Sequence, residues 1–232
     1  MAEEFVLGVD LDGVCGDHAE AFRRVVAASR GLEPGDLEPQ RSWDFVEWGL
    51  TRDEFDGLHR TAVLEQHMFR TMPVIPGAAE ALWRLSDAGV WIRLITHRLY
   101  ANWSHAAAVA DTVVWLDEHA IPYRDLCFLG QKPQVEADAY LDDAPHNIEA
   151  LRASGAVAAV FDQPYNREVD GPRVVGWAEA EEWVLDLMAD SGRAVQAPIA
   201  LGEAPVGRLR RDRVAGRSEP GRRGAGPDVD RP

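Results

Sequence analysis

Short apolar runs alternate with amphipathic stretches along most of this chain. The runs predict buried strands over residues 5–9, 90–95, 125–129, 139–141 and 157–161. Apolar positions at helical spacing predict helices over residues 17–28, 76–89, 101–119, 145–154 and 177–188. Strands that alternate with helices are typical of an α/β fold with a doubly wound parallel sheet, whose two faces are covered by helices.

The segment between the first two predicted strands has a different character. Residues 17–75 show no clear strand pattern, and they are helical in pattern and rich in aromatic side chains. Prolines at positions 34, 39, 73 and 76 break this segment, because proline cannot continue a helix from its interior. We therefore expect several short helices and loops here.

The most informative motif follows the first strand directly, as Asp10-Leu11-Asp12-Gly13-Val14. Asp10 and Asp12 lie two residues apart, so in extended chain their side chains point the same way. A hairpin turn at Asp12-Gly13 is disfavoured, because a helical pattern follows instead of a partner strand. Two neighbouring carboxylates repel unless one is protonated or both share a cation. The motif therefore predicts a chemical site at the carboxyl edge of the sheet.

Three further features fall at the same predicted edge. Thr96 ends the second strand, and Asp142-Asp143 follow the strand over residues 139–141. Lys132 lies in the loop before that strand and is the single lysine among the 24 basic residues. A lysine supplies a compact ammonium suited to a phosphate or a carboxylate. Because parallel strands share one carboxyl edge, these side chains are expected to meet Asp10 and Asp12.

The expected set of side chains is suited to phosphate chemistry. Four carboxylates in one crevice require a divalent cation, and oxygen ligands with room for water favour Mg²⁺. The metal and Lys132 would neutralise phosphoryl oxygens, and the Thr96 hydroxyl would donate a hydrogen bond. Asp10 could then attack phosphorus, while Asp12 would protonate the leaving oxygen and later activate water.

In the order of these motifs the chain resembles the phosphohydrolases of the haloacid dehalogenase superfamily. Asp10-x-Asp12-Gly-Val, Thr96, Lys132 and Asp142-Asp143 match motifs one to four of that superfamily. The resemblance implies a Rossmann-like core with a small helical cap inserted after the first strand. The expected division is a core of residues 1–15 and 76–195, a cap of residues 16–75, and a tail of residues 196–232.

Within that superfamily the chain resembles the cytosolic 5′(3′)-deoxyribonucleotidases. The similarity rests on Ile75-Pro76-Gly77-Ala78, on the run from Lys132 to Pro145, and on the helix with Trp177 and Trp183. It implies that Asp10 accepts the phosphoryl group and that Asp12 is the acid/base. It also implies that Asp10, the main-chain carbonyl of Asp12, and Asp143 hold Mg²⁺. Thr96 and Lys132 would bind phosphate, and Asp142 would orient the site.

The chain departs from that family beside the phosphate site. Thr96-His97-Arg98 stands where the family tends to have Thr-Ser-Pro, and Pro133 replaces a threonine after the motif-three lysine. His97 and Arg98 are therefore candidate substrate contacts, with Arg98 as a phosphate clamp and a supporting role as the alternative for His97. Trp43 and Phe45 fall where the family's cap lines a nucleobase pocket. For either aromatic residue, a place in the cap core is equally expected.

Composition limits the partners. The net charge of −15 argues against a nucleic-acid duplex or an anionic membrane.

Residues 203–232 are rich in Gly, Pro and Arg without apolar periodicity, so a disordered tail is expected there. Cys15 and Cys127 lack metal-site spacing, which fits a reducing cytoplasm. No apolar stretch approaches the roughly 20 residues that span a bilayer. The sequence leaves the oligomeric state open, with a homodimer as one option.

These observations favour a Mg²⁺-dependent phosphomonoesterase that dephosphorylates nucleoside 5′-monophosphates, with deoxyribonucleotides preferred, through an aspartyl phosphate. The first alternative keeps the chemistry but changes the substrate to a sugar phosphate or another small phosphoester. The second is a phosphoacceptor or binding protein without enzymatic activity. Its acceptor aspartate would lie between the acid pair and the threonine, where this chain carries the cap-like insert.

Overall fold

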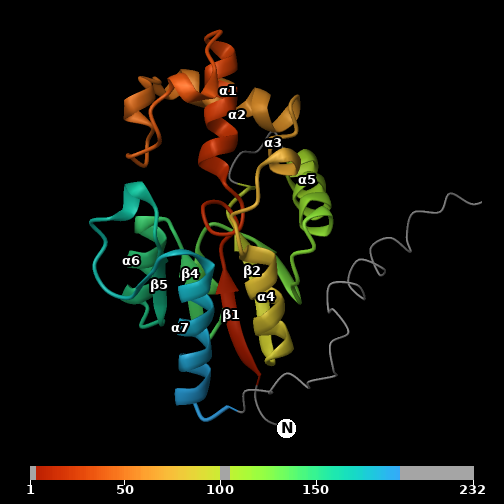
Figure 1. The fold of residues 1–232 in the computed structure, drawn as a ribbon, viewed down its shortest axis with the longest axis vertical. Helices are drawn as coiled ribbons and strands as arrows, with labels where there is room; N and C mark the ends of the chain where they lie inside the picture. Colours follow the sequence, from red (N-terminus) through yellow and green to blue (C-terminus); the bar gives the residue numbers. More distant parts are fainter. Residues whose placement is uncertain (1–3, 100–104, 194–232) are drawn as a thin grey trace, which may run out of the picture. The chain divides into compact units, whose positions relative to one another are not determined.

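Six parallel strands form one sheet in the part of the chain that the computed structural model describes, residues 4–99 and 105–193 (Figure 1). The strands are β1 (Phe5–Val9), β2 (Val90–Thr96), β3 (Asp125–Phe128), β4 (Ala139–Asp142), β5 (Ala158–Phe161) and β6 (Arg173–Val174). Their order is β3-β2-β1-β4-β5-β6, so the connections run in opposite directions on the two sides of β1. Such a switch point is where open α/β sheets bind ligands.

The register of the central strands decides which side chains meet at this switch point. Val9 at the end of β1 pairs with Leu94 of β2 and with Leu141 of β4. The N–H of Asp10 continues the pairing by donating to the carbonyl of Leu141 at 3.0 Å. Asp10 therefore stands level with the last residues of both neighbours, among them Asp142.

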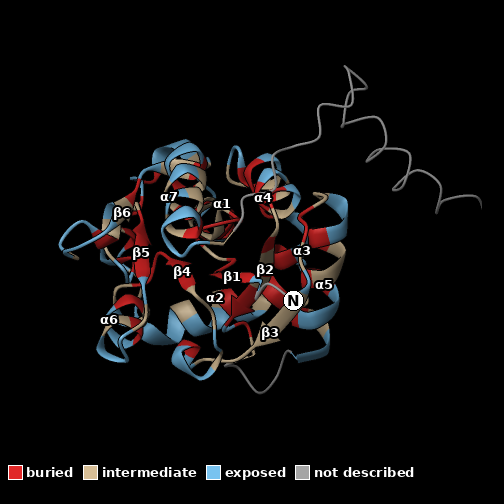
Figure 2. Ribbon diagram, turned by 90° about the horizontal axis from the view of Figure 1, so that it is seen from below, coloured by how far each residue is buried: buried red, intermediate tan, exposed pale blue. Residues whose placement is uncertain are grey.

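Helices cover both faces of the sheet, as the alternating pattern predicts. They are α4 (Ala78–Asp87), α5 (His105–Glu118), α6 (Pro145–Ala153) and α7 (Gly176–Asp190). Leu82 of α4, Trp115 of α5 and Val184 of α7 belong to one buried cluster with Leu7 of β1. α6 packs on the opposite face through a second buried cluster, and Figure 2 shows it across the sheet from α4 and α7.

A helical segment between β1 and β2 lies beyond the carboxyl ends of the strands (Figure 1). It contains α1 (His18–Ser29), α2 (Arg52–Leu64) and α3 (Met68–Thr71), with short 3-10 turns at η1 (Pro34–Asp36) and η2 (Val46–Trp48). Its interior is an aromatic cluster built around Phe22, whose ring packs against those of Phe45, Trp48, Phe55 and His59. We call this segment the cap, and it provides one wall of the site.

Local sequence signals fix where the cap helices begin. The Asp17 carboxylate accepts a hydrogen bond from the N–H of Glu20 at 2.9 Å and so caps α1. At α2 the side chains of Thr51 and Glu54 form a reciprocal capping box. The cap helices therefore start at defined residues next to the site.

The α/β fold with a parallel sheet is confirmed, and all five predicted strands are present. β6 was not predicted, because two residues are too short to give a periodic pattern. α5 is described from His105, and the first four residues of the helix predicted over 101–119 lie outside the described residues. The tail of residues 196–232 lies outside them too, and the core and cap limits stay a prediction. None of the described helices is long and apolar enough to cross a membrane.

Candidate active site

Asp10, Asp142 and Asp143 meet at the carboxyl edge of β1 and β4. Each offers a carboxylate oxygen, and these oxygens lie within 4.8 Å of one another. Asp142 and Asp143 are almost fully buried, and Asp10 is buried as well. The sequence predicts this convergence, and the register of β1 and β4 produces it.

Lys132 supplies the positive charge at the centre of this cluster. It opens the short turn η3 (Lys132–Gln134), and only 2% of its surface is exposed. Its ammonium donates to Asp10 and forms an ion pair with Asp142. Burial alone would lower the pKa of Lys132, but the two carboxylates raise it above its ordinary value. The lysine is therefore charged, and it links the strand ends of β1 and β4.

One ammonium does not balance three carboxylates. Burial raises the pKa of Asp10 to about 7, with Asp142 and Asp12 adding to the rise and Lys132 opposing it. Burial, Asp10 and Asp142 raise the pKa of Asp143 well above its ordinary value. Carboxylates that are this unfavourable together are stabilised by a further cation. An all-oxygen donor set of this kind fits a hard divalent ion such as Mg²⁺.

The loop after Asp10 passes close to the Asp143 carboxylate. Gly13 has a left-handed φ of 79°, and a Cβ there would lie 2.1 Å from Asp143 Oδ2. The loop is held by hydrogen bonds from the Gly13 N–H to the carbonyl of Gly16 and from the Gln163 amide to the carbonyl of Gly13, at 2.8 and 2.7 Å. Glycine at position 13 is therefore required both by the backbone conformation and by the closeness of Asp143.

Two neighbours orient the carboxylates of the cluster. Tyr165, in the turn η4 (Pro164–Asn166), donates its hydroxyl hydrogen to Asp143 Oδ2. Asp142 accepts hydrogen bonds from the N–H of Ala144 at 2.9 Å and from the side-chain amide of Asn147 at 3.2 Å. Asp142 is thus engaged by these donors and by Lys132, and its supporting role stays a prediction.

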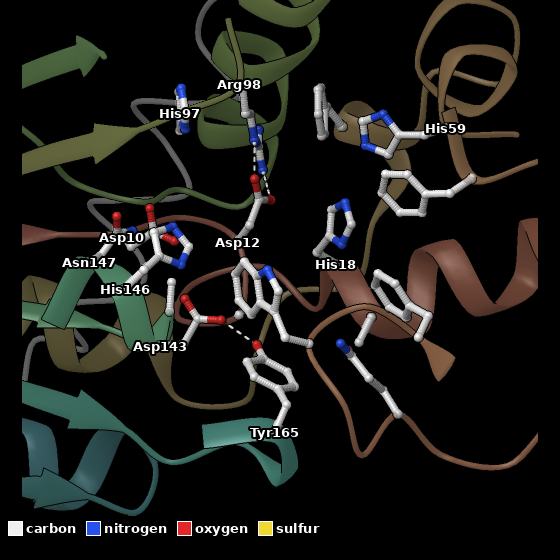
Figure 3. A pocket seen from close by; sticks show the side chains of 18 of the residues that line it. Asp10, Asp12, His18, His59, His97, Arg98, Asp143, His146, Asn147 and Tyr165 are labelled. Carbon is white, nitrogen blue, oxygen red and sulfur yellow. Dashed lines mark hydrogen bonds and ion pairs between the residues drawn. The ribbon is translucent and has the colours of Figure 1, made fainter. Parts of the chain in front are cut away.

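Asp12 lies apart from the cluster and pairs with Arg98. The guanidinium donates from Nε to Asp12 Oδ2 at 3.0 Å and from Nη2 to Asp12 Oδ1 at 2.7 Å, a bidentate arrangement (Figure 3). Burial acts to raise the pKa of Asp12, yet Arg98 holds it below its ordinary value. Arg98 itself is 2% exposed, so its donors are directed into the protein.

Thr96 and His97 follow the predicted order at the end of β2. The Thr96 side chain is buried, and its hydroxyl has no hydrogen-bond partner among the described residues. An unpaired buried hydroxyl is costly, which is consistent with a ligand that accepts its hydrogen bond. His97 packs over Gly130, where a Cβ would meet its ring, and it lines the pocket. The roles predicted for both residues stay predictions.

A cavity of about 380 Å³ connects the acidic cluster to the cap. The core side of its lining includes Asp10, Asp12, Asp143 and His97, and the cap side is mainly aromatic. Figure 3 shows His18 and His59 on the cap side, opposite Asp143 and His146. Burial lowers the pKa of His59 to about 4, so this imidazole is neutral. The pocket thus joins a charged floor to a mainly aromatic wall, which also includes Gln40 and Arg52.

Trp43 and Phe45 both line this cavity but in different environments. Phe45 is 6% exposed and stacks on Trp48 with ring centroids 4.7 Å apart, within the aromatic cluster of the cap. Trp43 is 48% exposed, and its ring meets those of His146 and Tyr165 edge-on at 5.2 and 5.5 Å. Trp43 therefore bridges from the cap to the core beside Asp143, whereas Phe45 belongs to the cap core.

Several residues of the site were not predicted as site residues. They include His59, His146, Asn147 and Tyr165, which line the cavity together with His18, Gln40, Arg52, Phe55 and Phe69. Tyr165 and Asn147 lie just beyond β5 and β4, so a rule that inspects every polar residue after a strand could have found them. His59 lies on α2, far from any strand end, and the sequence gives no comparable signal for it.

Comparison with solved structures identifies the class of fold. A haloacid dehalogenase-like protein of unknown function from Agrobacterium tumefaciens str. C58 aligns with a TM-score of 0.51 at 15% identity, covering 81% of this chain and 100% of that one. The fold of the core is therefore similar to that of this haloacid dehalogenase-like protein, as expected from the ordered motifs.

Comparison of sequences identifies the family. The profile described as "5' nucleotidase, deoxy (Pyrimidine), cytosolic type C protein" matches residues 4–190. A Chlorobaculum tepidum protein named "Putative 5'(3')-deoxyribonucleotidase" is 42% identical over 180 residues, which cover 77% of this chain and 89% of that protein. The 5'(3')-deoxyribonucleotidase of Bacillus subtilis strain 168 is 26% identical over 125 residues, 53% of this chain and 68% of that protein. The chain belongs to this 5′-nucleotidase family, and it is a hydrolase of phosphoric monoesters.

Proposed function

We propose that this protein hydrolyses nucleoside 5′-monophosphates, with a preference for deoxyribonucleotides, through a phosphoryl group carried on Asp10. The observation that carries the proposal is the placement of Asp10 beside Lys132 at the floor of a cavity whose opposite wall is aromatic. Such a cavity can take a charged phosphate at one end and a flat base at the other. Family membership and the names of the relatives support the same substrate class.

The first chemical step transfers the phosphoryl group to the enzyme. A carboxylate oxygen of Asp10 attacks phosphorus, and the bond from phosphorus to the nucleoside oxygen breaks with its electron pair on that oxygen. Asp12 enters this step protonated and gives its proton to the leaving oxygen, which leaves Asp12 as a carboxylate beside Arg98 for the second step. Lys132 and the Thr96 hydroxyl bind the phosphoryl oxygens, whose negative charge they stabilise.

The second step restores the enzyme. A water molecule attacks phosphorus, and the bond between phosphorus and Asp10 breaks with its electron pair returning to the carboxylate. Asp12 takes a proton from the attacking water, and inorganic phosphate leaves. The two carboxylates therefore have different roles, one as nucleophile and one as acid/base. Their separate positions, with Asp10 beside Lys132 and Asp12 beside Arg98, are consistent with these roles.

The donor set supports Mg²⁺ as the cofactor. Asp10, Asp143 and the main-chain carbonyl of Asp12 would hold it, and Tyr165 would orient Asp143. When bound, Mg²⁺ supplies charge neutralisation for the carboxylates and for the phosphoryl oxygens.

The aromatic wall supports the nucleobase end of the pocket. Trp43 lines the cavity and is 48% exposed, and the buried ring of Phe45 belongs to the same lining. Stacking of a base on an aromatic side chain contributes about 1–3 kcal/mol and tolerates different bases.

A cytoplasmic location, expected from the cysteine usage, belongs to the same proposal and agrees with the "cytosolic" description of the family.

The test is phosphate release with Mg²⁺ from a panel of 5′- and 3′-nucleotides, ribonucleotides, deoxyribonucleotides and sugar phosphates. The proposal predicts release from nucleoside 5′-monophosphates, with the highest kcat/KM for deoxyribonucleotides. Release confined to sugar phosphates would keep the chemistry and replace the substrate. No release from any compound by the folded, Mg²⁺-loaded protein would favour a phosphoacceptor or binding role.

A further inference from the structure

Arg98 is buried at a junction between the core and the cap. It follows β2 and is 2% exposed, and its guanidinium carbon lies 4.3 Å from the centre of the Phe69 ring of α3. Its Nη1 donates to the Thr112 hydroxyl of α5 at 2.8 Å, and its Nη2 lies 3.3 Å from the sulfur of Met72. A side chain held by this many partners is fixed in one orientation.

The remaining donors of this fixed side chain are directed at Asp12. Nε and Nη2 contact the two carboxylate oxygens separately, at 3.0 and 2.7 Å. A guanidinium fork of this kind fixes both the position and the plane of a carboxylate. Lys132, by contrast, contacts Asp10 and Asp142, not Asp12. The two aspartates of the first motif are therefore oriented by different cations.

The bidentate pair leaves acceptor sites open on Asp12. Two hydrogen bonds from a guanidinium, one to each oxygen, require both oxygens to be acceptors. A carboxylate has about four lone-pair sites, so two remain for another donor. Asp12 lines the cavity together with Asp10 (Figure 3), so a water molecule that attacks a phosphoryl group on Asp10 can reach it.

We propose that Arg98 is a positioning residue that holds the Asp12 carboxylate ready to accept the proton of the attacking water. The inference rests on the proposed function. In this step the water oxygen bonds to phosphorus, the bond from phosphorus to Asp10 breaks, and its electron pair returns to Asp10. The water proton passes to Asp12. In this role Arg98 acts through Asp12, whose two carboxylate oxygens it contacts.

The consequence is specific to one half of the reaction. The value of kcat/KM covers the steps up to departure of the leaving group, whereas kcat also covers hydrolysis of the phosphoenzyme. p-Nitrophenyl phosphate has a leaving group that departs without a proton donor. With this substrate, loss of Arg98 is expected to slow kcat but to leave kcat/KM nearly unchanged, so that KM falls in parallel.

The experiment is rapid-mixing kinetics of p-nitrophenyl phosphate with the full chain and Mg²⁺. Arg98→Gln is expected to release one equivalent of p-nitrophenolate per enzyme in a burst, followed by turnover about 10²-fold slower than in the wild type. Arg98→Lys keeps the charge but loses the fork, so a smaller loss is expected. The burst amplitude also counts the correctly folded sites.

Two comparisons separate positioning from general damage. Arg84→Gln removes another arginine–carboxylate pair made by Nε and Nη2, a more exposed one between Arg84 of α4 and Glu181 of α7 at 2.6–2.9 Å, and wild-type kinetics are expected. In an Asp12→Asn background, Arg98→Gln should cause no further loss, because Arg98 acts only through Asp12.

The outcomes distinguish this inference from the proposed function. A parallel fall of kcat and kcat/KM without a burst in both Arg98 variants, or an undiminished effect of Arg98→Gln in the Asp12→Asn background, would overturn the positioning role. So would an unchanged kcat. A wild-type protein that releases no phosphate from any substrate would instead refute the proposed function.

Discussion

The hydroxyl of Tyr165 donates to Asp143, and this contact connects the acidic cluster to a residue that contacts the cap. On the cap side, Tyr165 contacts Trp43, and the centroids of the two rings lie 5.5 Å apart. A donor to a ligating carboxylate fixes its orientation and tunes its affinity for metal. Tyr165 thus belongs to the proposed metal site although it is not itself a proposed ligand.

Tyr165→Phe should weaken Mg²⁺ binding by about 10–100-fold, because the hydroxyl is lost while the ring contacts remain. Titration of Mg²⁺ followed by the thermal unfolding midpoint measures the affinity without relying on activity. Tyr123→Phe, which removes a hydroxyl before β3 at the opposite edge of the sheet, is the matched control. An unchanged Mg²⁺ affinity in Tyr165→Phe would show that the hydrogen bond has no part in metal binding.

Lys132→Met should destabilise the folded state, because it leaves Asp10 and Asp142 without their shared ammonium. Breaking a buried ion pair by removing one partner costs about 3–5 kcal/mol. The free energy of unfolding, measured in denaturant without Mg²⁺, checks this magnitude. If the variant were as stable as the wild type, Lys132 would not be the ion that holds the strand ends of β1 and β4 together.

Trp43→Ala should affect substrate binding, whereas Phe45→Ala should affect the stability of the fold. Trp43 is half exposed, so its loss should raise KM for a nucleotide by about 5–150-fold, the equivalent of the about 1–3 kcal/mol of base stacking, with little change in stability. Phe45 is buried in the aromatic cluster, so its loss should lower the free energy of unfolding by about 3–5 kcal/mol. KM and denaturant unfolding on both variants test the contrast. Equal effects on KM and on stability in the two variants would contradict it.

His59 should make the folded protein sensitive to acid. Its pKa falls from 6.5 to about 4 on burial, so the unfolded chain binds the proton more readily between these values. Its contribution to stability is therefore complete above pH 6.5 and is lost as the pH falls towards 4, by about 3 kcal/mol in total.

His59→Phe removes this titration and suits the aromatic neighbours, since the ring of Phe55 stacks 5.5 Å from that of His59. The measurement is the difference between the unfolding free energies of wild type and variant from pH 7 to pH 4. The difference should shift by about 3 kcal/mol in favour of the variant as the pH falls. A constant difference across this range would contradict the burial of a neutral imidazole.

The position of the charged cluster could be predicted from the sequence because it depends on strand ends. Asp10, Lys132 and Asp142 each lie beside an apolar run, and parallel strands bring such positions to one edge. The order of the motifs was enough to predict the class of core. Neither the exact register nor a long-range contact was needed for that prediction.

The partners of these residues could not be predicted in the same way. Arg98 meets Asp12, Thr112 and Phe69 from three separate elements, and this meeting depends on how the cap and α5 pack. Trp43 and Phe45 are two residues apart, yet Trp43 is half exposed and Phe45 is buried, with a left-handed φ of 56° where the chain turns into η2. Side-chain environments of this kind follow from packing and not from local pattern.

The most direct test of the account compares phosphate release from a deoxyribonucleoside 5′-monophosphate by wild type, Asp10→Asn and Asp186→Asn, all with Mg²⁺. Asp186 lies exposed on α7, so its variant makes the same chemical change away from the site. The account predicts that Asp10→Asn abolishes release while Asp186→Asn retains the wild-type rate. Sustained release by folded Asp10→Asn would contradict the claim that Asp10 carries the phosphoryl group.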